Sequence, residues 1–235
     1  MCHAIQVTDI TGVIDHGMWN LAPPFTDIHI VPFPPISWMD NKSFGLEYFE
    51  GMHSQTGTYL ETPAHYYGNQ GSYLLTDVPV ERLYNIPCVV LNLGLWTPDR
   101  SKGRQPITRD MLQSCSNAGD IQPGDAILIG TGWGRYWMKP ETMDRAPYLT
   151  RDAMDWLLER RPFLLGGDFP QWDTAENPQG FFEAFYSANV LMGGPFVNLE
   201  RIGPGRCNLT ILPIKVCHTS CAPARAIIAE QKSNT

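Results

Sequence analysis

The chain has 235 residues, of which 43% are hydrophobic and 17% charged, and its formal net charge at pH 7 is −7. This length and composition suit one globular domain spanning residues 1–235. The acidic balance argues against nucleic-acid binding, because phosphate contacts need clustered Lys and Arg. No apolar run approaches the length of a membrane helix, and the N-terminal residues lack the pattern of a secretory signal. We therefore expect a cytoplasmic protein with no membrane partner.

Six cysteines are scattered along the chain, and no Cys-x-x-Cys pair occurs among them. A chain of this length needs no disulfide bonds for stability, so we expect reduced thiols that pack as small hydrophobic side chains. Only Cys217 and Cys221, which flank His218, suggest chemistry. For Cys217 the structural interpretation is favoured, whereas for Cys221 a structural and a functional role are equally open.

In chain order, the first 50 residues are rich in proline and aromatic side chains, which predict an extended arm over residues 1–50 with short strands such as residues 28–31. Residues 53–61 look extended as well, because Thr56 and Thr58 favour strands. Continuous apolar runs predict further strands, and capping residues followed by apolar spacing predict helices. The predicted strands are residues 86–93, 125–129, 163–165 and 208–216, and the predicted helices are residues 108–115, 150–160 and 181–192. This irregular alternation predicts a mixed α/β domain.

The segment from residue 53 to residue 61 concentrates polar groups. Alternate side chains of a strand share one face. One face of this strand would carry four polar side chains: His53, Gln55, Tyr59 and Glu61. Gly57 would lie among them and leave room for a ligand. Such a face is typical of an active site, but a purely structural strand can show the same pattern, and the spacing alone leaves both interpretations open.

Two aspartates follow the strand predicted at residues 163–165. Asp168 and Asp173 lie where the strand runs out into a Gly-Gly-Asp sequence, and acids at such a sheet edge often belong to binding sites. Either aspartate would serve equally well as a loop-capping residue. Asp168 is the stronger candidate for a functional role. Trp133, in the Gly-Thr-Gly-Trp sequence after residues 125–129, is a further candidate.

Short motifs occur in order along the chain: Gly57-Thr58-x-x-Glu61-x-Pro63-x-His65, Thr131-Gly132-Trp133, Gly167-Asp168, Pro213-x-Lys215 and Pro223-x-Arg225-Ala226. Together they resemble the cyclase family of metal-dependent hydrolases, which includes bacterial kynurenine formamidase and isatin hydrolase. The resemblance implies a swivelling β/β/α fold, with a mixed-sheet, barrel-like core and flanking helices. It implies hydrolysis of an amide, lactam, lactone or ester, with a zinc or manganese ion activating the water. It also implies a small-molecule substrate and a homo-oligomer, a dimer or tetramer, with sites near subunit contacts.

The family pattern is His-x-Gly-Thr-His-x-Asp-x-Pro-x-His, in which the first two His and the Asp bind metal. Gln55, Tyr59 and Glu61 stand at those three places in this chain. His65 matches the final His, which usually has an acid–base role. Gln and Tyr are poor metal ligands beside imidazole, because a neutral amide oxygen is a weak donor and a phenol must lose a proton near pH 10.

Two further metal ligands of the family align with Phe182 and Gly194. The usual two-metal site is therefore lost, which leaves one divalent metal, zinc or manganese, or none. The ligands of a single ion would come from Gln55, Glu61, His65, His218 and Cys221. The last two stand where the family tends to have glycine.

The sequence thus predicts an enzyme, a hydrolase that opens a small cyclic or aryl carbonyl compound. Its catalytic residues would be Glu61, His65 and Tyr59, with the tyrosine donating a hydrogen bond to a developing oxyanion. The substrate would contact Gln55, His53, Trp133, Asp168 and Tyr66. One alternative is a metal-independent cyclase, dehydratase or isomerase of secondary metabolism that uses Glu61 and His65. Another is a non-catalytic binding protein on the same fold.

Overall fold

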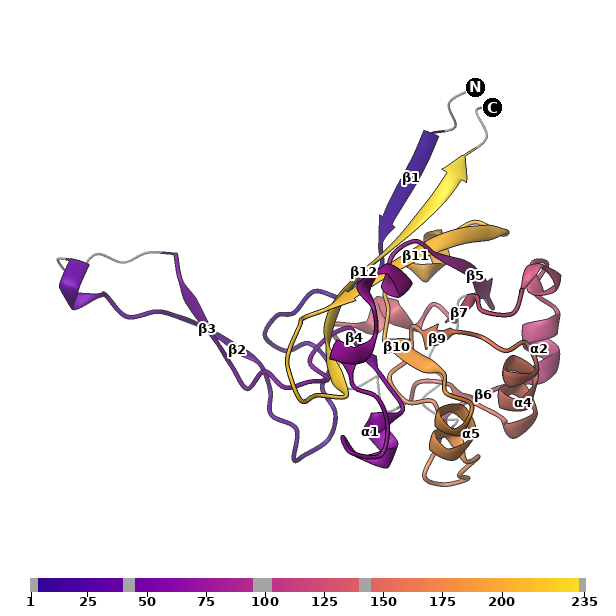
Figure 1. The fold of residues 1–235 in the computed structure, drawn as a ribbon, viewed down its shortest axis with the longest axis horizontal. Helices are drawn as coiled ribbons and strands as arrows, with labels where there is room; N and C mark the ends of the chain where they lie inside the picture. Colours follow the sequence, from indigo (N-terminus) through magenta and orange to yellow (C-terminus); the bar gives the residue numbers. More distant parts are fainter. Residues whose placement is uncertain (1–3, 40–44, 95–102, 140–144, 233–235) are drawn as a thin grey trace.

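The computed structural model describes residues 4–39, 45–94, 103–139 and 145–232 of the chain. Its centre is a closed barrel of mixed strands (Figure 1). Around the ring these strands are β4 (Tyr59–Glu61), β10 (Leu191–Gly194), β9 (Leu164–Gly167), β7 (Ala126–Gly130), β5 (Ile86–Asn92), β11 (Arg206–Pro213) and β12 (Cys221–Lys232). The ring closes because β4 pairs with both β10 and β12. The mixed α/β fold with a barrel-like core is therefore confirmed.

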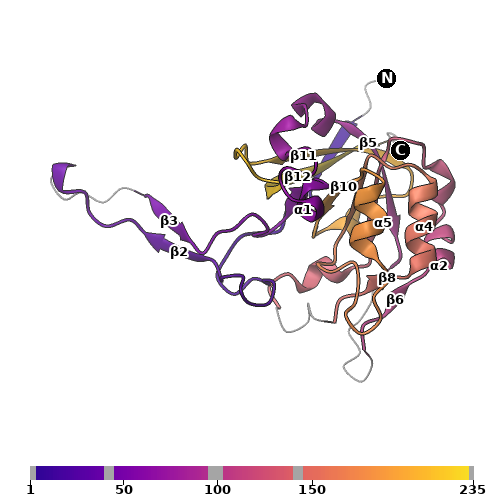
Figure 2. The same cartoon turned by 60° about the horizontal axis from the view of Figure 1, so that its bottom comes forward.

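Strands β5, β7, β9 and β10 run parallel to one another, whereas β4, β11 and β12 pair antiparallel. Three helices pack on one side of the barrel (Figure 2). They are α2 (Arg109–Gln113), α4 (Arg151–Glu159) and α5 (Phe181–Ser187). Strand alternation separates two apolar layers: Ile127 and Ile129 face the cluster that includes the buried side of α4, whereas Leu128 belongs to the other core cluster.

The continuous apolar runs predicted buried strands correctly at β5, β7 and β9. The cap predicted for α2 is also present, because the Thr108 hydroxyl accepts a hydrogen bond from the Met111 backbone at 3.4 Å. Thr150 precedes α4 as predicted, but its hydroxyl donates to the carbonyl of Ile107 instead of capping the helix. None of the helices in the described residues is both long and apolar enough to cross a membrane.

The predicted helix over residues 181–192 is wrong in its second half. Helix α5 ends at Ser187, and Asn189 adopts a left-handed conformation with φ of 61°. Such a residue stops a helix, and asparagine tolerates it well. The chain then enters β10, so Met192 belongs to the barrel and not to the helix.

The predicted strand over residues 53–61 is also shorter than expected, since only Tyr59–Glu61 is extended. Residues 53–58 form a hydrogen-bonded turn, in which the backbone of His53 donates to the Thr56 hydroxyl and accepts from the Thr56 backbone. Gly57 has φ of 76°, and a Cβ atom there would lie 3.0 Å from Ile14. This glycine therefore provides backbone freedom and close packing, and not space for a ligand.

A hairpin of β2 (His29–Pro32) and β3 (Glu47–Glu50) extends away from the barrel (Figure 1). The predicted arm over residues 1–50 is therefore only partly correct. The hairpin extends from the barrel, but β1 (Ala4–Asp9) pairs with β12, and Ile10 and Trp19 are buried. Residues 1–3 and 40–44 lie outside the described residues. The other described strands and α-helix are β6 (Pro106–Ile107), β8 (Tyr148–Leu149) and α1 (Ala64–Tyr67), and short 3-10 helices occur in the connecting loops.

Candidate active site

Glu61 ends β4 and points its carboxyl group into a buried position, where only 5% of the residue is exposed. Strand register determines its neighbours. Glu61 is paired with Cys221 on β12 and with Met192 on β10, and Tyr59 precedes it by two residues on the same strand. Directly opposed strand residues have close Cβ atoms, so the barrel brings the thiol and the carboxyl group together.

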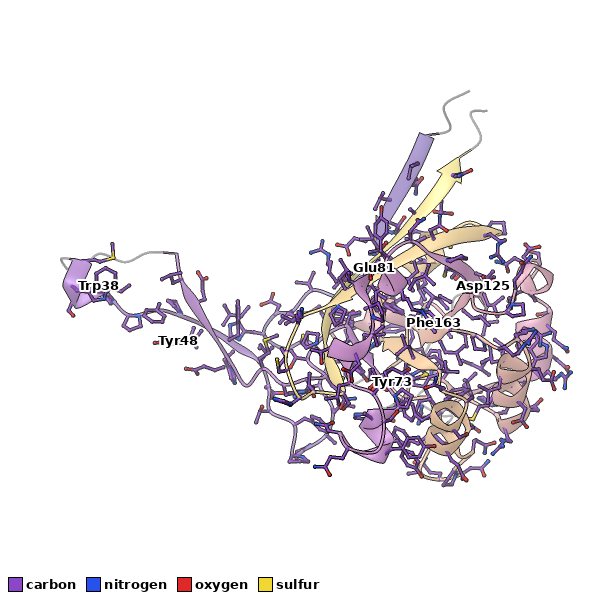
Figure 3. The ribbon with its side chains drawn as sticks, viewed as in Figure 1. Trp38, Tyr48, Tyr73, Glu81, Asp125 and Phe163 are labelled. Carbon is purple, nitrogen blue, oxygen red and sulfur yellow. The ribbon has the colours of Figure 1, made fainter. Side chains whose placement is uncertain are left out.

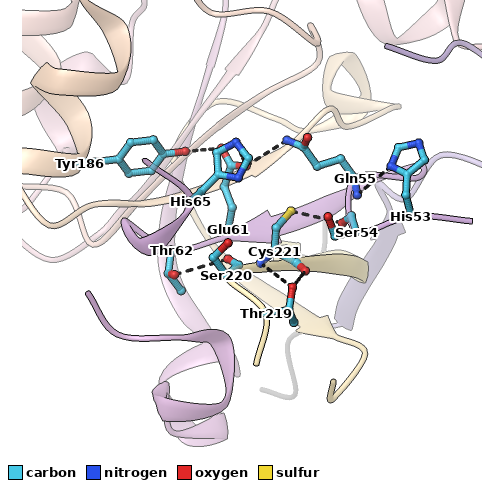
Figure 4. A network of polar contacts seen from close by, with 10 residues as sticks. All are labelled: His53, Ser54, Gln55, Glu61, Thr62, His65, Tyr186, Thr219, Ser220 and Cys221. Atoms are coloured by element: carbon cyan, nitrogen blue, oxygen red, sulfur yellow. Dashed lines mark hydrogen bonds and ion pairs between the residues drawn. The ribbon is translucent and has the colours of Figure 1, made fainter. Parts of the chain in front are cut away.

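Both oxygens of the Glu61 carboxyl group have partners (Figure 4). The Tyr186 hydroxyl donates a hydrogen bond to Oε1. The Gln55 amide donates to Oε2 at 3.2 Å, and the His65 ring nitrogen Nε2 lies 3.7 Å from the same oxygen. Gln55 comes from the turn before β4, His65 from α1 and Tyr186 from α5. Three separate segments thus converge on one carboxyl group.

Burial raises the pKa of Glu61, although the charge of His65 and the hydrogen bonds from Tyr186 and Gln55 act in the opposite direction. Burial also raises the pKa values of Tyr59, Tyr186 and Cys221. These two phenols and the thiol therefore keep their protons near neutral pH. Within this cluster, the Glu61 carboxyl group therefore loses its proton more readily than the phenols or the thiol around it, and the His65 imidazole lies beside it.

The cluster lies at the edge of a cavity of about 520 Å³. Its polar lining consists of Gln55, Tyr59, Glu61 and His65, together with Gln171, Asp173 and Thr174 of the loop before α5. The remaining wall is mostly apolar or aromatic and includes Leu21, Phe25, Pro170, Trp172, Ala175, Pro178, Phe181 and Phe182. A cavity of this size and character suits a small organic molecule with one or two polar groups.

The loop between β9 and α5 provides much of this wall, and two charged side chains hold it. Asp173 accepts backbone hydrogen bonds from Gln179, Gly180 and Phe181 at 2.7, 3.1 and 3.1 Å. This carboxylate therefore holds the two ends of the loop together and accepts hydrogen bonds from the free backbone N–H groups at the start of α5. Arg104 donates to the backbone carbonyls of the same loop, including Gln171 and Asp173.

The structure brings together five of the predicted site residues: Gln55, Tyr59, Glu61, His65 and Cys221. The Cys221 thiol donates to the Ser54 carbonyl at 3.2 Å and also lies within hydrogen-bonding reach of Glu61. Their assignment to the site remains a prediction, which this convergence supports. Gln55 arrives through the turn and not through strand alternation.

The other predicted site residues lie elsewhere. The His53 ring contacts Asn20 and Phe25, and Tyr66 stacks on Phe182 with ring centroids 5.9 Å apart, outside the cavity lining. Trp133 is buried in the core, outside the cavity lining. His218 lies in the turn between β11 and β12, where its carbonyl accepts from Asn69.

Asp168 is also outside the cavity. Its carboxyl group accepts from the Thr131 backbone and hydroxyl and from the Gly132 backbone, at 2.7 to 3.0 Å. Burial raises its pKa to about 6 against the opposing effect of these hydrogen bonds. The loop-capping interpretation therefore describes Asp168 and Asp173 better than a direct contact with substrate.

Tyr186, which donates a hydrogen bond to Glu61, and the aromatic wall of Trp172 and Phe181 were not predicted from the sequence. A usable signal was present on α5. Phe182 and Tyr186 are four residues apart, so they share one helix face, and their rings are stacked 5.9 Å apart. A lone phenol on such an aromatic face needs a partner when it is buried.

The donor set does not fit a divalent metal. Zinc and manganese bind deprotonated or imidazole ligands arranged around a common point. Here the carboxylate and the imidazole contact each other, and both carboxylate oxygens accept hydrogen bonds. Within the described residues, no group of three or more His, Cys, Asp or Glu side chains is placed to hold an ion. The predicted five-residue ligand set is thus not assembled.

Comparison with known proteins agrees with this fold. Isatin hydrolase A from Labrenzia aggregata, bound to benzyl benzoate, is 16% identical, with a TM-score of 0.78 over 97% of this chain and 94% of its own. An isatin hydrolase bound to the product analogue thioisatinate is 20% identical, with a TM-score of 0.77 over 97% and 93%. A predicted metal-dependent hydrolase from Bacillus stearothermophilus is 22% identical, with a TM-score of 0.73 over 97% and 100%. At these identities, the likeness establishes the fold.

A search of curated protein sequences found no match. The sequence profile of the family described as "Putative cyclase" matches residues 8–174, which is more than half of the chain and includes β4 and α1. Since both the sequence profile and the barrel agree, the chain belongs to the cyclase family.

Proposed function

We propose that this protein is an acid–base hydrolase that opens a small cyclic or aryl carbonyl compound, a lactone, ester or amide. The observation that supports it best is the buried Glu61 carboxyl group beside His65, at the edge of an apolar cavity. A buried carboxyl group with a raised pKa next to an imidazole is typical of proton-transfer sites. Family membership and the isatin hydrolases of the same fold are consistent with this class of reaction.

In the proposed reaction, His65 takes a proton from a water molecule, and the resulting hydroxide adds to the substrate carbonyl. The Glu61 carboxylate, 3.7 Å from Nε2, stabilises the imidazolium. Tyr59 lines the cavity and donates a hydrogen bond to the oxyanion of the tetrahedral intermediate. The imidazolium then gives its proton to the leaving oxygen or nitrogen, the single bond between that atom and the former carbonyl carbon breaks, and the carbonyl group re-forms. The products are a carboxylic acid and an alcohol or amine, on one molecule when the substrate is a ring.

Some relatives of the same fold are described as metal-dependent hydrolases. No step of the reaction proposed here passes through a metal, because the donors around Glu61 do not fit one. Dialysis against a chelator should therefore leave activity unchanged. Activity that is lost on chelation and restored by zinc or manganese would contradict the metal-free form of the proposal.

A metal-independent cyclase, dehydratase or isomerase is the second candidate. It is favoured by the same carboxyl group, since a buried Glu61 with a raised pKa suits removal and return of a proton on carbon. The two reactions differ in whether solvent oxygen enters the product. Turnover in H₂¹⁸O followed by mass spectrometry separates them: hydrolysis places ¹⁸O in the product acid, whereas cyclisation, dehydration or isomerisation does not.

The catalytic roles are tested on a panel of lactones, aryl esters and anilides. We expect His65→Ala and Glu61→Gln each to lower kcat/KM by about 10²–10⁴-fold, as for other groups that transfer or stabilise a proton. His218→Asn is the matched control, because His218 lies outside the cavity and its left-handed backbone suits asparagine. Variants that keep activity within a few-fold of the wild type would refute the proposal.

A panel without any turnover, on a protein that still binds its members, would favour the non-catalytic binding protein. A cytoplasmic location and a small molecule as the partner stay predictions from the sequence.

A further inference from the structure

The cavity beside Glu61 is lined by few side chains that can carry a charge. Among the described residues that line it, none is Lys or Arg, and the two acidic side chains are Glu61 and Asp173. Asp173 is occupied, because it accepts four backbone hydrogen bonds, including one from Thr174 at 2.8 Å. Arg104, behind the loop, donates to the carbonyls of Ala146 and Gln171. The lining therefore offers hydrogen bonds to a neutral carbonyl group but no Lys or Arg to a carboxylate, and its one imidazole, His65, is already paired with Glu61 at 3.7 Å.

The shape of the cavity adds a second selection. Trp172 and Phe181 are stacked, with ring centroids 5.8 Å apart and an interplanar angle of 14°. Phe182 lies beside His65, with ring centroids 6.2 Å apart, and is 44% exposed. All three rings line the cavity, and Phe182 lies next to the imidazole. A planar ring fits against them better than a branched or extended chain.

We propose that this cavity selects uncharged planar carbonyl compounds and rejects the corresponding carboxylates. The inference rests on the proposed function of the same site and deepens it. An anion entering the cavity loses water without gaining a Lys or Arg partner, and it approaches the Glu61 carboxyl group that already pairs with His65. A neutral lactone or aryl ester meets neither cost. Hydrolysis converts such a substrate into a carboxylate, so the charge that the reaction creates also drives the product out.

The test compares two ligands of one shape. 2-Acetylnaphthalene is uncharged and cannot be hydrolysed, whereas 2-naphthoate carries a carboxylate at the same ring position. Isothermal titration calorimetry at pH 7.5 measures both dissociation constants without any turnover. We expect the ketone to bind at least about tenfold more tightly than the carboxylate. Equal or tighter binding of 2-naphthoate, or binding of neither compound, overturns the proposal.

Two substitutions test whether the lack of Lys and Arg in the lining causes the preference for the ketone. Phe182→Arg and Gln171→Arg each place a cation in the lining, so either one should lower the ketone-to-carboxylate preference by about tenfold. Val80→Arg adds the same charge at an exposed position that lines a different groove, and it should leave the preference unchanged. Loss of ring stacking in Phe182→Arg affects both ligands alike and cancels in the ratio. A preference that stays at the wild-type value in both cavity variants overturns the proposal.

This outcome is separable from the fate of the proposed reaction. If Glu61→Gln and His65→Ala do not lower turnover while the preference for the ketone holds, the reaction is refuted and the charge selection stands. If those variants lose activity but 2-naphthoate binds as tightly as the ketone, the reaction stands and the charge selection is refuted.

Discussion

Glu61 and Asp168 show how buried carboxyl groups serve two purposes in the same fold. Burial raises the pKa of both carboxyl groups. Glu61 contacts side chains that line a cavity, so its proton can be exchanged with a ligand. Asp168 contacts the backbone and hydroxyl of the loop after β7, and it is 1% exposed. In this protein a raised pKa shows only that a carboxyl group is buried. Contact with the cavity is what makes Glu61 the candidate catalytic group.

The Asp168 pKa predicts how stability depends on pH. Its folded value of about 6 lies above the ordinary 3.8, so the folded state binds the proton more tightly than the unfolded chain. This contribution to stability is fully present below about pH 4 and is lost as the pH rises through 6, by about 3 kcal/mol in total. Asp168→Asn removes the titration. Its free energy of unfolding in urea, measured from pH 4 to 8, should therefore fall less with rising pH than that of the wild type.

Glu61→Gln provides the comparison for this experiment, because the Glu61 pKa is raised in the same direction. Each substitution should flatten the pH dependence separately. Parallel stability curves for Asp168→Asn and the wild type between pH 4 and 7 would contradict the assignment of a raised pKa to Asp168.

At the scale of the elements, sequence reasoning succeeded where the signal is local. The apolar runs of β5 and β7 and the Thr108 cap of α2 are local patterns, and each element formed as predicted. Prediction from the sequence failed where one residue with a left-handed backbone changes the direction of the chain. The left-handed residues Gly57 and Asn189 turn the chain before β4 and after α5, and apolar periodicity does not record them.

The site itself depends on contacts that no local pattern contains. Tyr186 and Glu61 are 125 positions apart, and only the closure of the barrel and the packing of α5 bring them together. The Glu61–His65 pair was accessible from the sequence because the two residues are four positions apart. The family resemblance pointed to both residues, but it gave no indication of the Tyr186 phenol that donates to Glu61.

The loop before α5 gives a prediction at this scale. Asp173→Ala leaves the backbone N–H groups of Gln179, Gly180 and Phe181 without their acceptor. We expect a loss of about 1–2 kcal/mol in the free energy of unfolding, as for other residues that satisfy helix starts. Asp155→Ala is the control, because its ion pair with Arg151 lies on the surface and should contribute less than about 1 kcal/mol. Equal effects in the two variants would mean that Asp173 does not hold the loop.

At the scale of the whole molecule, the closed barrel leaves the β2–β3 hairpin without a partner. Figure 3 shows Trp38 and Tyr48 on this arm, away from the body of the protein. Trp38 is 79% exposed and Phe49 is 60% exposed. An isolated two-stranded hairpin is marginally stable in water, so an arm that presents aromatic side chains needs a surface to pack on.

A second copy of this chain fits that need. Strand β3 carries Glu47 and Glu50, and the described part of residues 28–50 contains no Lys or Arg. An apolar groove of about 420 Å³, lined by Leu212, Ile214 and Lys215 among others, is present on every copy. The arm carries aromatic and acidic side chains, and the groove carries apolar side chains and Lys215. The arm of one copy is therefore complementary to the groove of another. The homo-oligomer expected from the family resemblance would then form through the arm.

We predict that the protein is a dimer or tetramer and that the arm holds it together. Size-exclusion chromatography with light scattering should give a multiple of the 26.4 kDa chain mass for the wild type. Trp38→Ser together with Phe49→Ser should shift the protein toward the monomer, because those two side chains provide much of the exposed apolar surface of the arm. Tyr84→Ser removes an exposed aromatic ring away from the arm and should leave the mass unchanged. A wild-type monomer at micromolar concentration, or an oligomer that survives the double substitution, would exclude the arm as the interface.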